Sequence, residues 1–134
     1  MVFGSIADEY RQQLTELYEK YSDRVKYTGF LTLTEIYNLY LAADLAVFPG
    51  SQSALWQQAI ACGVPTAFKR WPNIDYLDVG GNAVFLEKAD CQEIKALIEE
   101  LVSDKKKISK MKEVARIKGY KMFSYSEIAR KSLQ

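Results

Sequence analysis

The sequence predicts a three-layer α/β/α domain in which helices cover both faces of a mostly parallel sheet and further helices follow at the C-terminal end. Segments with apolar residues at helical spacing alternate with short runs of β-forming residues, and such alternation builds right-handed crossovers between parallel strands. Residues 45–48 are apolar throughout, which is typical of a central parallel strand covered on both faces. The length of 134 residues suits one hydrophobic core, so we expect a single domain over residues 1–134.

The first half of the chain is expected to hold three strands, at residues 1–3, 25–27 and 45–48. Tyrosine and leucine residues recur at helical spacing over residues 10–21, which predicts a helix with Ser5 as its N-cap. Thr32 and Glu35 have the spacing of a capping box, so a second helix is expected to begin there and to reach residue 43.

The second half of the chain continues the alternation of strands and helices. Residues 54–62 predict a helix that ends at Gly63, and Asp90 is expected to cap a further helix. Strands are expected between these two helices, at residues 66–68 and 83–86. Apolar residues at helical spacing continue beyond Asp90 to the end of the chain and predict the C-terminal helices.

The chain contains no histidine, and this restricts the chemistry that its residues can perform. A Ser–His or Cys–His nucleophile pair, a histidine metal site and a histidine proton shuttle are excluded within these residues. The two cysteines, Cys62 and Cys91, stand far apart and are predicted to be reduced thiols of a cytoplasmic protein. No secretory leader is predicted, because the apolar run at the N-terminus is short and no basic residue precedes it. No membrane span is predicted, because Asp44 interrupts the longest apolar run.

Positive charge is concentrated near the C-terminal end of the sequence. Residues 1–104 include 8 basic and 15 acidic residues, whereas residues 105–134 include 10 basic and 2 acidic residues. Most of these cations lie between Lys105 and Lys121, on the helix face opposite the apolar residues. A solvated face, contact with an anionic membrane surface and nucleic-acid binding fit this pattern in that order of preference, and we expect no nucleic-acid partner.

Ligands of open parallel sheets bind at the carboxyl ends of the strands, which singles out four loops. Residues 49–53 carry small and hydroxyl side chains before a helix N-terminus, a pattern that fits a phosphate site and a plain helix cap equally. The turn at residues 4–5 is a weaker example of the same pattern. Residues 28–31 can offer backbone groups and an aromatic edge to a flat base, but taken alone they favour an ordinary turn. The fourth loop, residues 69–75, begins with the cations Lys69 and Arg70, which can neutralise a diphosphate, although a solvated pair is the commoner outcome.

Three motifs, in one order and spacing, carry a family resemblance. They are VKYTGF at residues 25–30, ADLAVFP at residues 43–49 and QAIACGVP at residues 58–65. In this register they resemble the glycosyltransferases called glycosyl transferases group 1. These are retaining enzymes of the GT-B architecture, which has two Rossmann-like domains, and the resemblance is to the C-terminal domain, which binds the donor. The resemblance covers nearly the whole chain and implies a Rossmann-like fold.

The resemblance implies roles for the loops at residues 49–53 and 28–31 and for Gln58. The residues expected at the donor diphosphate and sugar are Gly50, Ser51, Gln52 and Ser53. From their place at strand ends, and not from the resemblance, Gly4, Ser5, Lys69 and Arg70 are candidates for further diphosphate contacts. The residues expected at the nucleotide base are Gly29, Phe30 and Leu31. Ribose is expected at Gln58, and no metal or other cofactor is implied, because a helix terminus and cations take the place of magnesium at the diphosphate.

The same resemblance implies the donor-binding half of a hexosyltransferase-type enzyme, whose catalytic residue stays unassigned. Such an enzyme moves a sugar from a nucleotide-diphosphate sugar to a glycan or lipid-linked acceptor. A role in bacterial surface polysaccharide biosynthesis is expected, in the cytoplasm or at the inner face of the membrane. The N-terminal acceptor domain is expected to lie outside these residues, so the chain alone is expected to be inactive.

The two acidic positions that the family pairs in this region hold Gln58 and Gly50 here. The loss of both carboxylates motivates an alternative, a non-catalytic pseudo-glycosyltransferase module that acts in protein–protein interaction. The binding of nucleotide-diphosphate sugars discriminates between the enzyme and the module.

Overall fold

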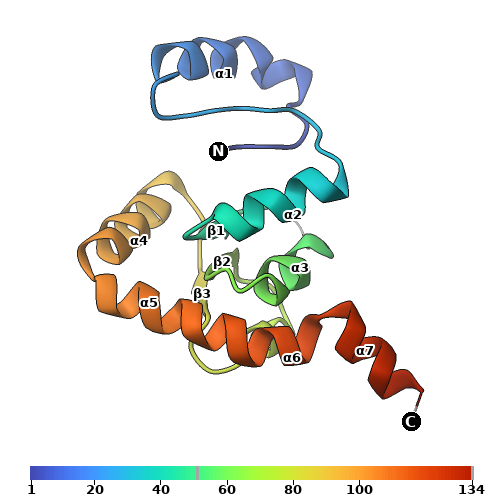
Figure 1. The fold of residues 1–134 in the computed structure, drawn as a ribbon. Coiled ribbons are helices and arrows are strands. Elements are labelled where there is room, and N and C mark those ends of the chain that lie inside the picture. The colour runs from blue at the N-terminus through green and yellow to red at the C-terminus, as the bar shows by residue number, and fades with distance from the viewer. Residues whose placement is uncertain (51, 134) are drawn as a thin grey trace. The chain divides into compact units, whose positions relative to one another are not determined.

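A computed structural model describes residues 1–50 and 52–133 of the chain (Figure 1). By its internal contacts the chain divides into two compact units, Met1–Ile36 and Tyr37–Gln134. Within the described ranges, no helix combines the length and the apolar character that a membrane span requires.

The first unit pairs two extended segments in parallel and carries helix α1 (Asp8–Lys20) between them along the chain. The Val2 N–H donates to the Lys26 carbonyl oxygen at 2.7 Å, and the Thr28 N–H donates to the Val2 carbonyl oxygen at 3.1 Å. The strands expected at residues 1–3 and 25–27 are thus reduced to one bridge, between Val2 and Tyr27.

The two helix starts of the first unit follow the sequence prediction in one case only. Ala7, and not Ser5, is the N-cap of α1, and no side chain accepts a hydrogen bond there, so the predicted cap is wrong. The capping box of α2 (Leu33–Ala42) is confirmed. The Thr32 N–H donates to a Glu35 carboxylate oxygen at 2.8 Å, and the Glu35 N–H donates to the Thr32 hydroxyl oxygen at 3.3 Å.

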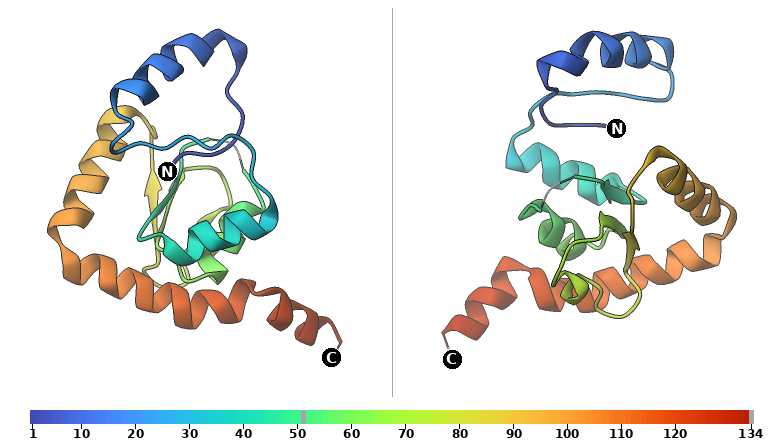
Figure 2. Two further views of the ribbon diagram at one scale, coloured as in Figure 1. Left: turned by 45° about the horizontal axis from the view of Figure 1, so that its top comes forward. Right: turned by 180° about the vertical axis from the view of Figure 1, so that it is seen from behind.

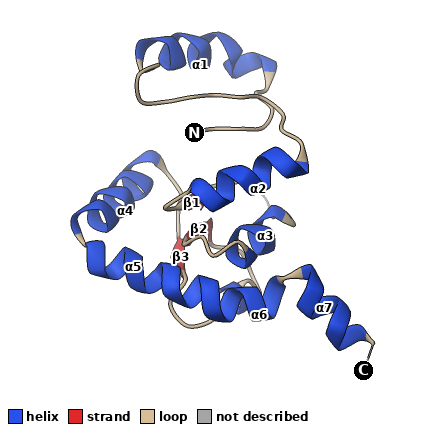
Figure 3. Ribbon diagram, in the orientation of Figure 1, coloured by secondary structure: helices blue, strands red, loops and turns tan. Residues whose placement is uncertain are grey.

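The second unit is built on a sheet of three parallel strands in the order β1-β2-β3 (Figure 3). The strands are β1 (Ala46–Phe48), β2 (Thr66–Lys69) and β3 (Ala83–Leu86). The predicted parallel sheet is confirmed, but the central position expected for residues 45–48 is wrong, because β2 is the middle strand. The apolar pattern predicted a central strand because residues 45–48 are covered on both faces. The edge strand β1 is covered in the same way, with Phe48 packed on one side and Val47 on the other.

Two helical layers cover the opposite faces of this sheet (Figure 2). One cluster joins Phe68 of β2 to α3 (Leu55–Ala61), the short helix η1 (Asp75–Leu77) and α6 (Tyr120–Phe123). The other cluster joins Ala67 to α4 (Cys91–Ser103) and α5 (Lys105–Val114). Neighbouring residues of a strand point to opposite faces, so one strand supplies both cores and the expected three-layer arrangement is present.

The C-terminal helices lie end to end, from α5 through a π-helical turn, η2 (Ala115–Gly119), into α6, and then α7 (Tyr125–Ser132) (Figure 1). The turn packs against α3 at Gly119, which is fully buried. A Cβ atom on Gly119 would lie 2.5 Å from Ile60 Cγ2 and 3.0 Å from the Ile60 carbonyl oxygen. The absence of a side chain at this position therefore lets the C-terminal helices approach α3 closely.

We expect Gly119→Ala to lower the free energy of unfolding by about 1–3 kcal/mol, because the added methyl group must displace Ile60. Urea denaturation followed by circular dichroism measures the change. Lys110→Ala, at an exposed position of α5, is the control and is expected to change the free energy by less than about 0.5 kcal/mol. Equal effects of the two substitutions would contradict the close packing of Gly119.

The turn between β3 and α4 is organised around the carboxylate of Glu93. Asp90 caps α4 as predicted, with its carboxylate accepting from the Glu93 N–H at 2.9 Å. The Glu93 carboxylate in turn accepts from the backbone N–H groups of Glu87, Lys88 and Ala89 at 2.7–2.9 Å. Partial burial raises the pKa of Glu93, but these three donors outweigh it, so the net shift of the pKa is downward.

Glu93→Gln is expected to lower the melting temperature at pH 7, because a neutral amide offers one acceptor oxygen where the turn donates to two. A carboxylate with a lowered pKa contributes stability above the pKa of the unfolded chain, and this contribution is lost as the pH falls through the folded pKa. The difference in melting temperature between wild type and variant should therefore shrink as the pH falls below about 4.3. A difference that is independent of pH between 7 and 3 would show that the ionised carboxylate has no such role.

Candidate functional site

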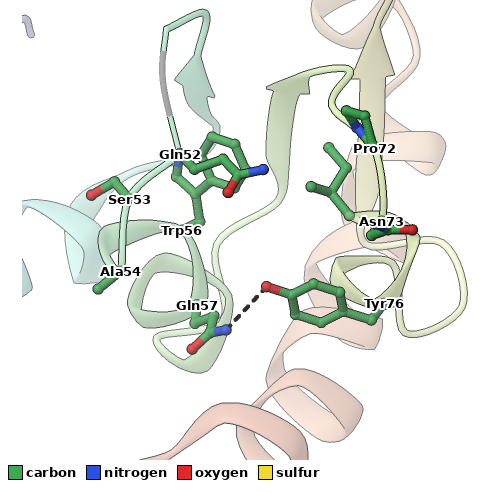
Figure 4. Close-up of a pocket in the computed structure, with 9 residues that line it drawn as sticks. Gln52, Ser53, Ala54, Trp56, Gln57, Pro72, Asn73 and Tyr76 are labelled. Atoms are coloured by element: carbon green, nitrogen blue, oxygen red, sulfur yellow. Dashed lines mark hydrogen bonds between the residues drawn. The ribbon is translucent and has the colours of Figure 1, made fainter.

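A groove of about 660 Å³ opens at the carboxyl ends of β1 and β2 in the second unit (Figure 4). One wall combines the loop after β1 with the first turn of α3, and its residues are Gln52, Ser53, Ala54, Trp56 and Gln57. The other wall combines the loop after β2 with η1, and its residues are Pro72, Asn73, Ile74 and Tyr76. The groove therefore lies where parallel α/β sheets bind their ligands.

The groove has apolar residues at its base and polar groups along its walls. Trp56 and Ile74 are each only 3% exposed, and the Trp56 ring packs on Phe68 with centroids 4.9 Å apart. Across the groove, the Gln57 side-chain amide donates to the Tyr76 hydroxyl at 3.2 Å (Figure 4). Asn73 has a φ of 64°, in the left-handed region that asparagine tolerates better than most residues.

The loop expected at the donor diphosphate and sugar forms one wall of this groove. Gln52 and Ser53 line it, and Ser51 lies outside the described residues. The Ser53 hydroxyl accepts from the Leu55 N–H at 3.2 Å, so this side chain already acts as a cap at the start of α3. The Trp71 indole N–H donates to the Gly50 carbonyl oxygen at 3.2 Å and links the loops that follow β1 and β2.

The two cations expected near the diphosphate differ in their surroundings. Arg70 contacts two carboxylates, Asp75 at 2.5 Å and Glu87 at 3.3 Å, and its guanidinium lies 4.2 Å from the centroid of the Phe85 ring. The Nε and Nη1 atoms of Arg70 therefore already donate to carboxylates within the protein. The Lys69 amine lies 5.2 Å from the centroid of the Trp71 ring, beside the bridge between the two loops.

Gln58, the residue expected at the ribose, is not among the described residues that line the groove. Its amide nitrogen donates to the Tyr125 hydroxyl of α7 at 2.8 Å, and its amide oxygen is buried without a hydrogen-bond partner among the described residues. Burial raises the pKa of the nearby Cys62 thiol, so this cysteine is protonated at neutral pH and is not an activated nucleophile.

The loop expected at the nucleotide base, residues 28–31, and the turn at residues 4–5 are hydrogen-bonded to each other within the first unit. The Gly4 N–H donates to the Gly29 carbonyl oxygen at 2.8 Å, and the Tyr27 hydroxyl donates to the Gly4 carbonyl oxygen at 2.6 Å. Gly4 and Gly29 have φ values of 118° and 68°, which favour glycine. Next to them, Ser5 is exposed, the Phe30 side chain is 84% exposed and Leu31 is half-buried.

Sequence-based prediction found the loops of the groove but missed most of the residues that line it, among them three with polar side chains. Gln57, Asn73 and Tyr76 line it, although only the two cations at the start of the second loop were selected. The available signal was the position of Asn73 and Tyr76 after a strand of the parallel sheet, at the edge where ligands bind. Among the described residues, no group of three or more cysteine, aspartate or glutamate side chains is placed to hold a metal ion.

The fold and the groove define a Rossmann-like α/β domain with a ligand site at the carboxyl ends of its strands. The model of one protein family, described as glycosyl transferases group 1, matches residues 1–118. The chain therefore belongs to the group 1 glycosyltransferases, a family that transfers sugars. A search of curated proteins found no match to the chain.

Proposed function

We propose that the chain binds the nucleotide-diphosphate sugar of a retaining glycosyltransferase of the GT-B architecture and forms the donor side of its active site. Membership of the family supports sugar transfer in general. The observation that carries the proposal is the groove itself, because the loop after each of two neighbouring parallel strands lines it. The hydrogen bond from Trp71 to Gly50 holds the two loops together.

Residues of four loops are proposed to contact the donor. Gly50, Ser51, Gln52 and Ser53 are proposed at the diphosphate and sugar, and Lys69 is the cation better placed than Arg70 to neutralise the diphosphate, since two carboxylates already pair with Arg70. Further candidates for the diphosphate are Gly4 and Ser5. The nucleotide base is proposed at Gly29, Phe30 and Leu31, and the Phe30 side chain, with its aromatic ring, is 84% exposed.

Ribose binding by Gln58 requires a change of hydrogen bonds. The amide of Gln58 now donates to Tyr125, so a ribose hydroxyl must replace that partner or reach the amide oxygen that has none. An amide can both donate to and accept from a hydroxyl group, so the role is chemically sound without the carboxylate.

The transfer is proposed to be of a hexose, to a glycan or a lipid-linked acceptor, in bacterial surface polysaccharide biosynthesis on the cytoplasmic side of the membrane. We propose that transfer also requires an acceptor-binding domain beyond these residues, because sugar transfer in a two-domain enzyme takes place in the closed cleft between its domains. The residues of the groove then bind and orient the donor, and exclude water from one side of the sugar.

The alternative is a non-catalytic module that keeps the fold and binds a partner protein. Two points favour it. In the register of the family resemblance, Gln58 and Gly50 stand where the family has carboxylates, and the Gln58 amide donates to the Tyr125 hydroxyl. The two functions differ in one measurable property, which is the binding of a nucleotide-diphosphate sugar.

Calorimetric titration with UDP- and GDP-sugars tests the proposal. We expect saturable binding of one nucleotide series, and a loss of at least about tenfold in affinity for the double variant Ser51→Ala with Ser53→Ala, because two hydroxyl contacts are removed. Ser109→Ala, on α5, is the control for serine substitution as such, and circular dichroism checks that each variant is folded. A protein that binds none of these donors would support the non-catalytic module instead.

The cationic C-terminal helices are proposed to contact an anionic membrane surface, which fits a lipid-linked acceptor. Lys107 pairs with Glu100 at 2.5 Å and Lys112 with Asp44 at 3.3 Å. Within the described ranges, Lys105, Lys106 and Lys110 have no carboxylate within ion-pair distance, so their charges remain available to lipid headgroups.

Sedimentation with vesicles that contain phosphatidylglycerol tests this contact at low and at moderate salt. The triple variant Lys105→Ala, Lys106→Ala and Lys110→Ala should weaken the association by about fivefold for each lysine removed. Vesicles of phosphatidylcholine alone provide the matched control surface. An association that does not weaken when salt is added would rule out the electrostatic contact.

A further inference from the structure

The polar groups that line the groove are all uncharged. Gln52, Ser53, Gln57, Asn73 and Tyr76 supply amides and hydroxyls, and none of the described lining residues is a lysine, arginine, aspartate or glutamate. The nearby guanidinium of Arg70 does not line the groove and is paired with Asp75 and Glu87.

This lining suits some chemical groups and disfavours others. Amide and hydroxyl groups can donate to and accept from the several hydroxyls of a sugar ring. The apolar residues at the bottom of the groove can contact the C–H groups of the ring. A carboxylate or an ammonium group placed in the groove would give up part of its hydration without an opposite charge to replace it. An uncharged sugar therefore fits this lining better than a charged one.

The hydrogen bond between Gln57 and Tyr76 presents a donor and an acceptor in a fixed arrangement. The Tyr76 oxygen accepts from the Gln57 amide nitrogen. Among the described residues, the Tyr76 hydroxyl proton and the Gln57 amide oxygen have no other hydrogen-bond partner, so both can bond a ligand. Tyr76 is 50% exposed, and its ring packs edge-on against Phe123 with centroids 6.2 Å apart. A rigid ring with an accessible hydroxyl can bind a sugar hydroxyl at little cost in side-chain entropy.

We propose that this groove binds the glycosyl group of the donor, that it is specific for an uncharged sugar, and that Gln57 and Tyr76 recognise the hydroxyl groups of that sugar. The inference rests on the proposed function, since it concerns the sugar end of the same donor. It names the class of sugar and two specificity residues.

A matched pair of donors on the nucleotide that the protein binds tests the class of sugar. The pairs are UDP-glucose with UDP-glucuronate, and GDP-mannose with GDP-mannuronate, each compared by calorimetry with the free nucleoside diphosphate. We expect the neutral member to bind about tenfold more tightly than the uronate, because the uronate carboxylate finds no cation in the groove. Equal or tighter binding of the uronate would overturn the inference and leave the proposed function standing. If no nucleotide or donor binds at all, the proposed function fails and the inference fails with it.

Tyr76→Phe and Gln57→Leu test the two specificity residues. Each should weaken binding of the neutral donor by about threefold to tenfold, as expected for one lost hydrogen bond, and leave the affinity for the free nucleoside diphosphate unchanged. Tyr120→Phe is the matched control, since Tyr120 is 48% exposed and its hydroxyl bonds to Ser126 outside the groove. An equal loss for donor and nucleoside diphosphate would show that these residues do not contact the sugar.

Gln57→Arg provides a test by gain of binding. The added cation at the wall of the groove should reduce or reverse the preference for the neutral donor, because it offers the uronate carboxylate an ion pair. A preference that is unchanged in a folded Gln57→Arg protein would place the sugar elsewhere and overturn the inference.

Discussion

The packing of three phenylalanine rings across the parallel sheet is the interaction on which the second unit depends. Phe48, Phe68 and Phe85 stand at the same register on β1, β2 and β3, with ring centroids 5.5 Å and 6.2 Å apart. Trp56 of α3 packs on the middle ring and also forms the base of the groove. The core and the candidate site therefore share a side chain, and α3 cannot shift without altering both.

The charge of Arg70, close to the groove, is neutralised by carboxylates of the protein itself, and this affects what the groove can bind. Arg70 is held by two carboxylates and an aromatic ring, although such partly exposed ion pairs contribute little to stability. The ion pairs of Arg70 matter for ligand binding, because they leave amides and hydroxyls as the polar groups that face a ligand in the groove. An uncharged groove beside a lysine at the strand end is consistent with a donor whose phosphates are charged and whose sugar is not.

Sequence-based prediction succeeded where the signal is local. The capping box of Thr32 and Glu35, the cap at Asp90 and the end of α3 at Gly63 each involve residues within a few positions of one another. Prediction failed for Ser5 because the chain starts its helix two residues later than the cap required, at Asp8 after Ala7. It also failed to place β1 at the edge of the sheet, because the order of strands follows from pairing between distant segments.

The alternation of strands and helices, the loops that follow the strands and the motifs of the family are properties of contiguous residues, so the sequence alone was enough to identify them. Which side chains line the groove could be known only from the tertiary structure. Gln57 and Gln58 are neighbours in sequence, yet successive residues of a helix point about 100° apart, so Gln57 reaches Tyr76 across the groove while Gln58 reaches Tyr125 of α7. Likewise, Arg70 is paired by Glu87, a residue brought to it only because β2 and β3 lie side by side.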